Sequence, residues 1–290
     1  MSWRRLIHGL MPLSLRRNLR NRAPGSRQVH EWEFIPEGWA YAQEHPEVKG
    51  WDVPDIVAVY KSRWLQFAGH VQSPGPLSIN HEAQTIFAES ASYHNLVMTY
   101  AYVLALAARH KDRIRMLDWG GGIGHYYLLA QSLLPGVEFD YHCRDLPQMC
   151  SYGHQLFPEQ SFFSDDRWHA NCYDLVMASS SLHYAEDWPE QLRDLCSVTH
   201  DLLFVTNLPI VRRVPSFVFI QRPYRHGYNT EYLGWCINEH ELVQTAAVAG
   251  LSQVRQFLYG FSPVIAGAPE QNVYRGYLFQ RHTKFVGVSR

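Results

Sequence analysis

Residues 113–127 of this 290-residue chain form a glycine-rich segment of the kind that brings backbone close to a ligand. A short apolar run leads into an acid and closely spaced glycines: Asp118, Gly120, Gly121, Gly122 and Gly124. A helical pattern follows from Tyr126 to Leu134. Glycines allow the turn without a blocking Cβ atom, and the following helix presents free N–H groups to an anionic group. The segment therefore predicts strand, turn and helix around a nucleotide-like ligand.

The glycine spacing separates two cofactor classes. The dinucleotide pattern G-x-G-x-x-G, counted from Gly120, would need its third glycine at His125. The spacing is instead acidic-x-G-x-G-x-G, which resembles motif I of the class I S-adenosylmethionine (SAM)-dependent methyltransferases. That resemblance implies a SAM cofactor held by Asp118 and the glycines. A glycine-rich surface turn without a ligand is the alternative.

Polar residues follow each of the next predicted strands, at 137–143, 161–163 and 173–178. The candidates are Asp145, Asp165, Asp166, Ser179 and Ser180. In an open parallel sheet the ligand lies beyond the carboxyl ends of the strands, so we expect these side chains to converge. Under the methyltransferase resemblance, Asp145 accepts from the ribose hydroxyls and Asp165 or Asp166 from the adenine amino group. Each acid alone is also typical of a helix cap or a solvated loop.

The resemblance extends beyond the glycine turn. Residues 117–127 and 181–187 are similar to a group of bacterial methyltransferases that often accompany surface-polysaccharide or other biosynthetic genes. The Asp145-Leu146-Pro147 tripeptide resembles the ribose-binding stretch of many small-molecule O-methyltransferases. Similarity covers the core and extends to residues 222–235. It implies a SAM-binding fold more firmly than it implies an acceptor, and the ribose assignment requires the second strand to end before Asp145.

Methyl transfer to a hydroxyl is an in-line displacement that also needs a base for the proton. Among 16 histidines, His183 follows the strand at 173–178 and is the first candidate. His125 begins the helix after the glycines and is the second, with contact to the methionine carboxylate or helix capping as alternatives. His94 lies on the helix predicted at 83–110, where simple packing is the alternative.

The segment 224–232 is rich in hydrogen-bonding aromatic and charged residues. It lies in a stretch longer than most connections, and we expect an acceptor-binding lid there, with a structured surface loop as the alternative. The candidate acceptor-binding residues are His94, Tyr126, Tyr184, Tyr224, Arg225, His226, Tyr228 and Asn229.

Composition limits the remaining classes. Hydrophobic residues make up 46% and charged residues 18% of the chain, as in soluble globular proteins. Five widely spaced cysteines form no C-x-x-C pair, so we expect no metal site and no disulfide framework, and a reducing cytoplasm as the location.

Charge is distributed unevenly along the chain. Residues 1–30 contain seven arginines and no acid, whereas the rest carries 19 basic and 27 acidic residues. An acidic body argues against nucleic acid as a partner. Residues 2–22 could form a short basic amphipathic helix that touches an anionic membrane or an acidic partner, or a basic tail. A homodimer is left open.

Strands alternating with helices after residue 112 predict an α/β fold. We expect a Rossmann-like, mostly parallel sheet of seven strands with an antiparallel last strand, and a helical N-terminal cap. The predicted organisation is a basic segment at 1–30, a helical cap or lid at 31–112, and a methyltransferase core at 113–290 with an insertion at about 209–236. Asp52 and Asn238 are expected to cap helices.

The predicted function is SAM-dependent O-methylation of a glycan or small-molecule metabolite. An enzyme that uses SAM differently, such as by intramolecular cyclisation, is one alternative. A non-catalytic SAM-binding partner protein is another. A nicotinamide oxidoreductase is disfavoured because His125 occupies the third glycine position.

Overall fold

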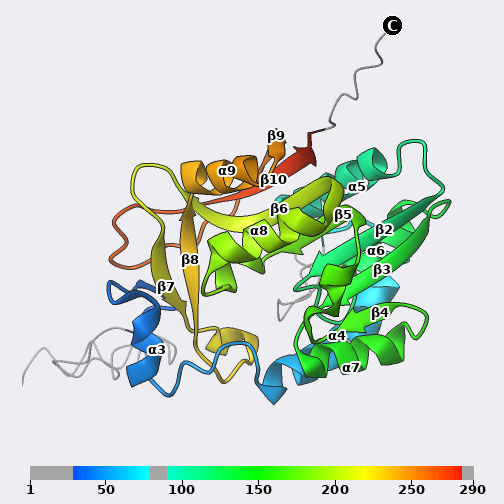
Figure 1. Cartoon of the computed structure of the whole chain (residues 1–290). Coiled ribbons are helices and arrows are strands. Elements are labelled where there is room, and N and C mark those ends of the chain that lie inside the picture. Colours follow the sequence, from blue (N-terminus) through cyan, green and yellow to red (C-terminus); the bar gives the residue numbers. More distant parts are fainter. Residues whose placement is uncertain (1–28, 79–89, 283–290) are drawn as a thin grey trace, which may run out of the picture. The chain divides into compact units, whose positions relative to one another are not determined.

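The computed structural model describes residues 29–78 and 90–282 (Figure 1). The described residues from Glu31 onward belong to one compact unit. The basic helix predicted at 2–22 and the beginning of the helix predicted at 83–110 lie outside the described residues. Within the described part, no helix is both long and apolar enough to cross a membrane.

Seven strands form the α/β sheet that the alternating pattern predicts. They are β2 (Arg113–Trp119), β3 (Glu138–Arg144), β4 (Ser161–Phe163), β5 (Tyr173–Ser179), β6 (Thr199–Val211), β9 (Leu251–Leu258) and β10 (Val273–Arg281). Their order is β4-β3-β2-β5-β6-β10-β9. The first five are parallel, and β10 is antiparallel to both β6 and β9. The mostly parallel sheet with an antiparallel last strand is confirmed.

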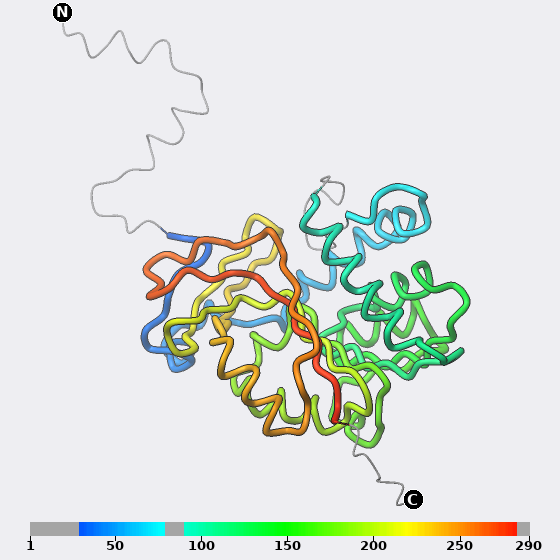
Figure 2. Tube along the Cα trace, turned by 90° about the horizontal axis from the view of Figure 1, so that it is seen from above, coloured from blue at the N-terminus to red at the C-terminus, as the bar shows by residue number. Residues whose placement is uncertain are grey.

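Three further strands make the predicted count of seven wrong, since the described residues form a ten-stranded sheet. They are β1 (Trp32–Phe34), β7 (Phe217–Gln221) and β8 (Tyr232–Asn238). The end of β6 pairs with β8 in parallel, and β8, β7 and β1 then pair antiparallel. In Figure 2, blue β1 lies beside the yellow and orange segments that it pairs with or bridges. The stretch at 209–236 therefore contains the end of β6, all of β7 and most of β8, and all five residues of β7 are buried.

Helices cover both faces of the sheet. They are α6 (His125–Leu133), α7 (Pro147–Leu156), α8 (Trp188–Val198) and α9 (Glu239–Val248). Successive strand residues point to opposite faces. Met116 accordingly packs in the cluster with α6 and α7, and Leu117 in the cluster with α8 and α9. Asn238 caps α9 as predicted, since its side chain accepts from the amides of His240 and Glu241.

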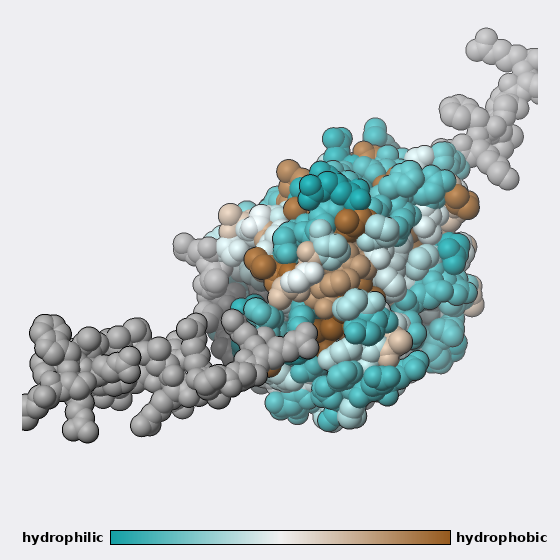
Figure 3. Space-filling model, turned by 90° about the vertical axis from the view of Figure 1, so that its left-hand side faces the viewer, coloured by the Kyte–Doolittle hydropathy of each residue, from teal (hydrophilic) through white to brown (hydrophobic). Residues whose placement is uncertain are grey.

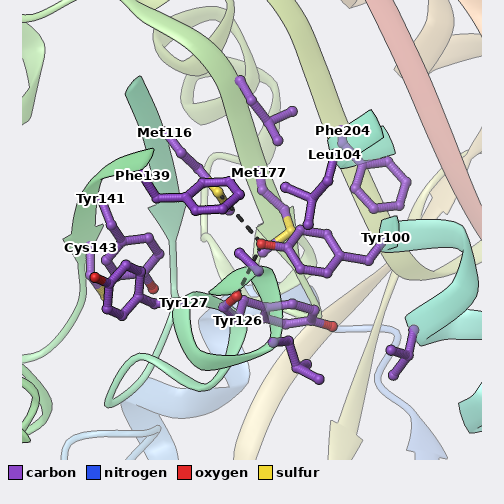
Figure 4. Packing of buried hydrophobic residues seen from close by; sticks show 14 of the residues in the cluster. Tyr100, Leu104, Met116, Tyr126, Tyr127, Phe139, Tyr141, Cys143, Met177 and Phe204 are labelled. Carbon is purple, nitrogen blue, oxygen red and sulfur yellow. Dashed lines mark hydrogen bonds between the residues drawn. The ribbon is translucent and has the colours of Figure 1, made fainter. Parts of the chain in front are cut away.

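Within the described residues, the two long helices before β2 are α4 (Pro54–Val71) and α5 (Ala91–Ala107), and both join the cluster with α6. Figure 4 shows how Tyr100 of α5 reaches into the core. Its hydroxyl donates to the carbonyl of Tyr126 at 3.0 Å and contacts the sulfur of Met116 at 3.6 Å. These contacts anchor the helical addition to the sheet and to the helix that follows the glycine turn.

The boundaries before β2 differ from the predictions. Val53, not Asp52, is the N-cap of α4, and no side chain caps the helix because valine has no hydrogen-bond acceptor. Pro54 occupies the first turn, where its missing amide donor is not needed. The second helix ends at Ala107 rather than His110, where the backbone turns to a positive φ of 66°. Residues 31–50 hold β1 and two short helices, Gly38–Ala40 and Tyr41–Glu44.

On the face of the molecule seen in Figure 3, hydrophobic side chains gather near the middle among hydrophilic ones.

Candidate functional site

The candidate site lies where the chain crosses from one side of β2 to the other. β2 sits between β3 and β5, and the carboxyl ends of all three strands are in register, with Trp119 opposite Arg144 and Asp118 opposite Met177. Ligands of open α/β sheets bind at such a switch in strand order. A cavity of about 300 Å³ is present there. It is lined by the glycine turn and by residues of β1, β3, β5, β7 and both N-terminal helices.

The glycine turn has the backbone that its spacing predicts. Gly120, Gly122 and Gly124 have positive φ angles of 75°, 62° and 97°. Gly120, Gly121 and Gly122 line the cavity. Gly124 instead is the N-cap of α6, and a Cβ atom there would lie 2.9 Å from the Phe157 ring. A Cβ on Gly121 would lie 2.5 Å from the carboxyl of Asp118. The turn is thus packed from beneath while its backbone faces the cavity.

Asp145 stands at the cavity wall next to this turn. β3 ends at Arg144, so Asp145 directly follows the strand as the ribose prediction requires. Its carboxyl oxygens accept from the amide of Gly122 at 2.7 Å and from the amide of Leu146 at 2.6 Å. Burial raises the pKa of Asp145, and these two hydrogen bonds oppose that rise. A carboxylate has about four acceptor sites, so Asp145 retains capacity for a ligand's hydroxyl groups. Leu146 lines the cavity beside it.

Asp118 occupies a different place from the predicted one. Its side chain is fully buried beneath the turn and does not line the cavity. One carboxyl oxygen accepts from the hydroxyl of Tyr141 at 2.7 Å, and the other has no partner among the described residues. Burial raises the pKa of Asp118 to about 7. Asp118 supports the glycine turn from below rather than facing the cofactor site directly.

The raised pKa predicts a pH-dependent stability. Folded Asp118 takes up a proton below about pH 7, and the unfolded chain does so only near the ordinary aspartate pKa of 3.8. Its contribution to stability is therefore lost as pH rises between these values, at about 1.4 kcal/mol per pKa unit. Asn at 118 removes the charge and keeps an acceptor for Tyr141. In urea unfolding, we expect Asp118→Asn to gain stability relative to the parent by roughly 2–3 kcal/mol more at pH 8 than at pH 5. An equal difference at both pH values would show that Asp118 ionises normally.

Asp165 and Asp166 do not reach the cavity, contrary to the expectation that all acids after the strands converge. Both side chains are exposed at the start of the short helix Asp166–Ala170. Asp165 pairs with Arg167 at 2.9 Å and accepts from its amide, which lowers the pKa of Asp165. The local turn and the ion pair with Arg167 thus keep the carboxylate of Asp165 away from the cavity lining.

Ser179 and Ser180 do line the cavity. The hydroxyl of Ser179 lies 2.8 Å from that of Tyr126, which also lines the wall. Ser180 has a positive φ of 55°, and its hydroxyl accepts from the side-chain amide of Asn207, which has the same φ. Non-glycine residues rarely adopt this conformation and tend to cluster at functional sites. Two such residues in contact at one wall mark this end of β5 and β6 as a built site.

Both candidate base residues reach the cavity wall. His183 belongs to the short helix Leu182–Tyr184 and is 1% exposed. Burial lowers the pKa of His183 to about 3, so its ring is neutral at physiological pH. Neither of its ring nitrogens has a hydrogen-bond partner in the described part of the chain. His125 is 3% exposed, and its ring makes an edge contact with Phe67 at 4.7 Å between centroids. The ring of His125 is packed among aromatic residues of α4, whereas both ring nitrogens of His183 are available to a hydrogen-bond partner from outside the described residues.

The predicted acceptor-binding residues divide into two groups. Those at the cavity wall are Tyr126, Tyr184, Arg225 and His226. Those away from the lining are His94, Tyr224, Tyr228 and Asn229. Tyr224 donates to Glu231, and Asn229 donates to Asp55 at 2.8 Å. The segment at 224–232 therefore meets the cavity through its short helix Tyr224–His226, and the remaining side chains tie the segment to its surroundings.

Several wall residues were missed from the sequence. They are Trp32, Trp51, Tyr60, Phe67, Asn207 and Gln221. The signal available was the concentration of aromatic residues between 32 and 67, which has no spacing that predicts a site. Trp32 and Gln221 reach the cavity through the pairing of β1 with β7, and Tyr60 and Phe67 reach it from α4.

Comparisons with known proteins give structural similarity only. No protein-family model and no curated protein matches the chain. Magnesium protoporphyrin IX methyltransferase from Synechocystis PCC 6803, a structure with bound SAH, is 14% identical with a TM-score of 0.47, covering 78% of this chain and 98% of that one. The CcbJ methyltransferase from Streptomyces caelestis is 13% identical with a TM-score of 0.48, covering 79% and 97%. The 1,6-didemethyltoxoflavin-N1-methyltransferase from Burkholderia thailandensis is 14% identical with a TM-score of 0.45, covering 81% and 92%. These identities and TM-scores are too low to transfer an activity or a substrate.

Proposed function

We propose that the protein is a SAM-dependent methyltransferase that O-methylates a glycan or a small-molecule metabolite. The observation that carries this proposal is the pairing of the glycine turn with Asp145 at one cavity wall. The amide of Gly122 donates to that carboxylate at 2.7 Å, so turn and acid form a single rigid unit at the carboxyl ends of β2 and β3. Such a unit suits a nucleoside carrying an amino acid group, because backbone and carboxylate face the same space.

The residues present fit this cofactor. Gly120, Gly121 and Gly122 line the cavity without side chains, and Leu146 and Met149 add an apolar surface next to Asp145. An adenine ring needs an apolar surface, and ribose hydroxyls need a carboxylate acceptor. We therefore propose that Asp145 holds the ribose and that the glycine turn and the start of α6 hold the methionine end.

Bound SAM would supply an electrophilic methyl group on its sulfonium. The chain must align an acceptor oxygen with that methyl, exclude water and accept the acceptor's proton. We propose that His183 accepts the proton, since it is neutral and lies at the wall. Its low pKa does not oppose this role, because the protonated ether formed as oxygen gains the methyl is a far stronger acid than an imidazolium. The proton would then move to His183 as the carbon–oxygen bond forms, not before.

Calorimetric titration with SAM tests the proposal first. We expect the parent chain to bind SAM and Asp145→Ala to bind it at least about tenfold more weakly, a loss of about 1.4 kcal/mol or more for a charge-assisted hydrogen bond. Asp166→Ala is the matched control, since that exposed acid does not line the cavity. No binding of SAM by the parent chain would contradict the proposal, and binding of NADH instead would favour an oxidoreductase.

The products then separate the remaining alternatives. A methyltransferase releases S-adenosylhomocysteine (SAH) only when an acceptor is added. Release of methylthioadenosine would indicate cyclisation or another use of SAM, and binding without any product would indicate a non-catalytic SAM-binding protein.

A further inference from the structure

We infer that the cavity wall formed by Trp32, Trp51, His183, Tyr184 and Gln221, here called the aromatic wall, binds the methyl acceptor, and that this acceptor is an uncharged ring bearing hydroxyl groups. The inference rests on the proposed function and specifies its substrate class. All five residues line the same cavity as the glycine turn.

The aromatic wall holds polar atoms that lack partners. Both ring nitrogens of His183 and the indole nitrogen of Trp51 are buried without a hydrogen bond to any described residue. Buried polar groups are nearly always paired, because leaving one unpaired costs about 1–3 kcal/mol. A neutral imidazole offers one donor and one acceptor, and an indole N–H offers one donor. A hydroxyl group both donates and accepts, so a hydroxylated ligand matches these atoms in chemistry. Because all three atoms are sealed from solvent, His183 and Trp51 must shift slightly for a ligand in the cavity to pair with them.

The remaining members of the wall are fixed by one another. The hydroxyl of Tyr184 donates to the side-chain oxygen of Gln221 at 2.9 Å. The rings of Trp51 and Tyr184 meet edge to face with centroids 5.1 Å apart, and the rings of His183 and Tyr184 lie 4.0 Å apart. Trp32 is the register partner of Gln221 across β1 and β7. The wall therefore presents rigid ring surfaces, and flat, preorganised surfaces favour a ring-shaped ligand over a flexible chain.

The aromatic wall itself is uncharged, and the charged groups that flank it are paired with one another. It contains no carboxylate, ammonium or guanidinium group, and His183 is neutral. The neighbouring Arg222 is directed into ion pairs with Glu33 at 2.9 Å and Glu231 at 3.2 Å. Arg225 also lines the cavity, and its guanidinium is paired at 3.0 Å with Glu31, the chain neighbour of Trp32. Burying an ionised ligand group against uncharged surface is costly, so the wall favours an acceptor without net charge.

Four probes test the inference in two matched pairs. The phenolic pair is 3,4-dihydroxybenzyl alcohol and 3,4-dihydroxybenzoate, and the sugar pair is methyl β-D-glucopyranoside and methyl β-D-glucuronopyranoside. Each pair differs by one carboxylate, and the two pairs distinguish phenolic from sugar acceptors. Affinity is measured on the SAH-saturated chain by ligand-observed saturation-transfer NMR, after SAM and SAH binding have been verified by calorimetry.

We expect the neutral member of at least one pair to bind at least about tenfold more tightly than its carboxylate partner. Trp51→Phe keeps a ring but removes the indole donor, and Gln221→Leu removes the partner of Tyr184. Each should weaken the neutral probe about fivefold or more without changing SAM affinity. Trp39→Phe is the control, because Trp39 packs against Trp235 at 6.0 Å and does not line the cavity.

Each contrary result has a defined meaning. Tighter or equal binding of the carboxylates, no binding of either neutral probe, or unchanged binding in both wall variants would overturn the inference while leaving the SAM proposal intact. Absence of SAM and SAH binding would overturn the proposed function itself.

Discussion

Replacing Gly122 by valine is expected to weaken SAM binding by roughly a hundredfold. Gly122 has a φ of +62°, which a β-branched residue adopts only at a cost of about 1–3 kcal/mol. Its Cβ would lie 3.3 Å from the ring of Tyr60, and valine adds two methyl groups beyond that atom. A backbone shift that relieves these contacts would also move the amide that donates to Asp145. Calorimetry with SAM measures the loss.

Gly136→Val is the matched control for this variant. Gly136 is exposed, and a Cβ there meets no atom within 4 Å. We expect its SAM affinity to match that of the parent chain. Circular dichroism and thermal unfolding of both variants establish that the fold is retained. If folded Gly122→Val bound SAM as tightly as Gly136→Val, the glycine turn would not be part of the cofactor site.

The glycine turn and Asp145 were predictable because their signal is local. An apolar strand, an acid, spaced glycines and a helix follow one another within about 20 residues, and the parallel sheet places the end of the next strand beside them. The same reasoning found Ser179 and Ser180 at the end of β5. These residues line the cavity as expected.

The acids at 118 and 165 show the limit of that local reasoning. Sequence position placed each at the end of a strand, but it did not show on which side of the turn the side chain lies. Asp118 is buried beneath the glycines, where Tyr141 from the neighbouring strand donates to it. Asp165 is turned outward by its pairing with Arg167 two residues later. Both outcomes depend on partners that glycine spacing does not specify.

Trp32, Trp51 and Gln221 of the aromatic wall could not be predicted for a different reason. β1 and β7 are far apart in the sequence, and their antiparallel pairing brings Trp32 next to Gln221. The apolar run from Phe217 to Ile220 was a short strand signal inside the stretch expected to be an insertion. Without knowledge of that pairing, the sequence does not show where in the fold the aromatic residues between 32 and 51 lie. Trp32 and Gln221 therefore join the proposed acceptor wall only through the strands added to the sheet, whereas His183 and Tyr184 were already candidates from the sequence.

Replacing His183 by alanine is expected to lower the turnover number by about 10²–10³-fold, with SAM affinity unchanged within about threefold. The variant removes the neutral ring that we propose accepts the proton, and the glycine turn and Asp145 remain. Release of SAH with the neutral probe that the parent chain methylates measures the effect. His154→Ala is the control, since His154 is exposed on α7 and does not line the cavity.

The protonation state of His183 provides a second test of the same role. Because burial lowers its pKa to about 3, the ring should stay neutral from pH 8 to pH 5. In ¹⁵N-histidine-labelled protein, we expect the His183 signals, assigned by their loss in His183→Ala, to keep the shifts of a neutral imidazole over this range. A ring that becomes charged below pH 7 would show that His183 is solvated or paired with an acid, contrary to the buried ring without a partner among the described residues. A turnover number in His183→Ala equal to that of His154→Ala would remove the base assignment and leave His183 only as part of the aromatic wall.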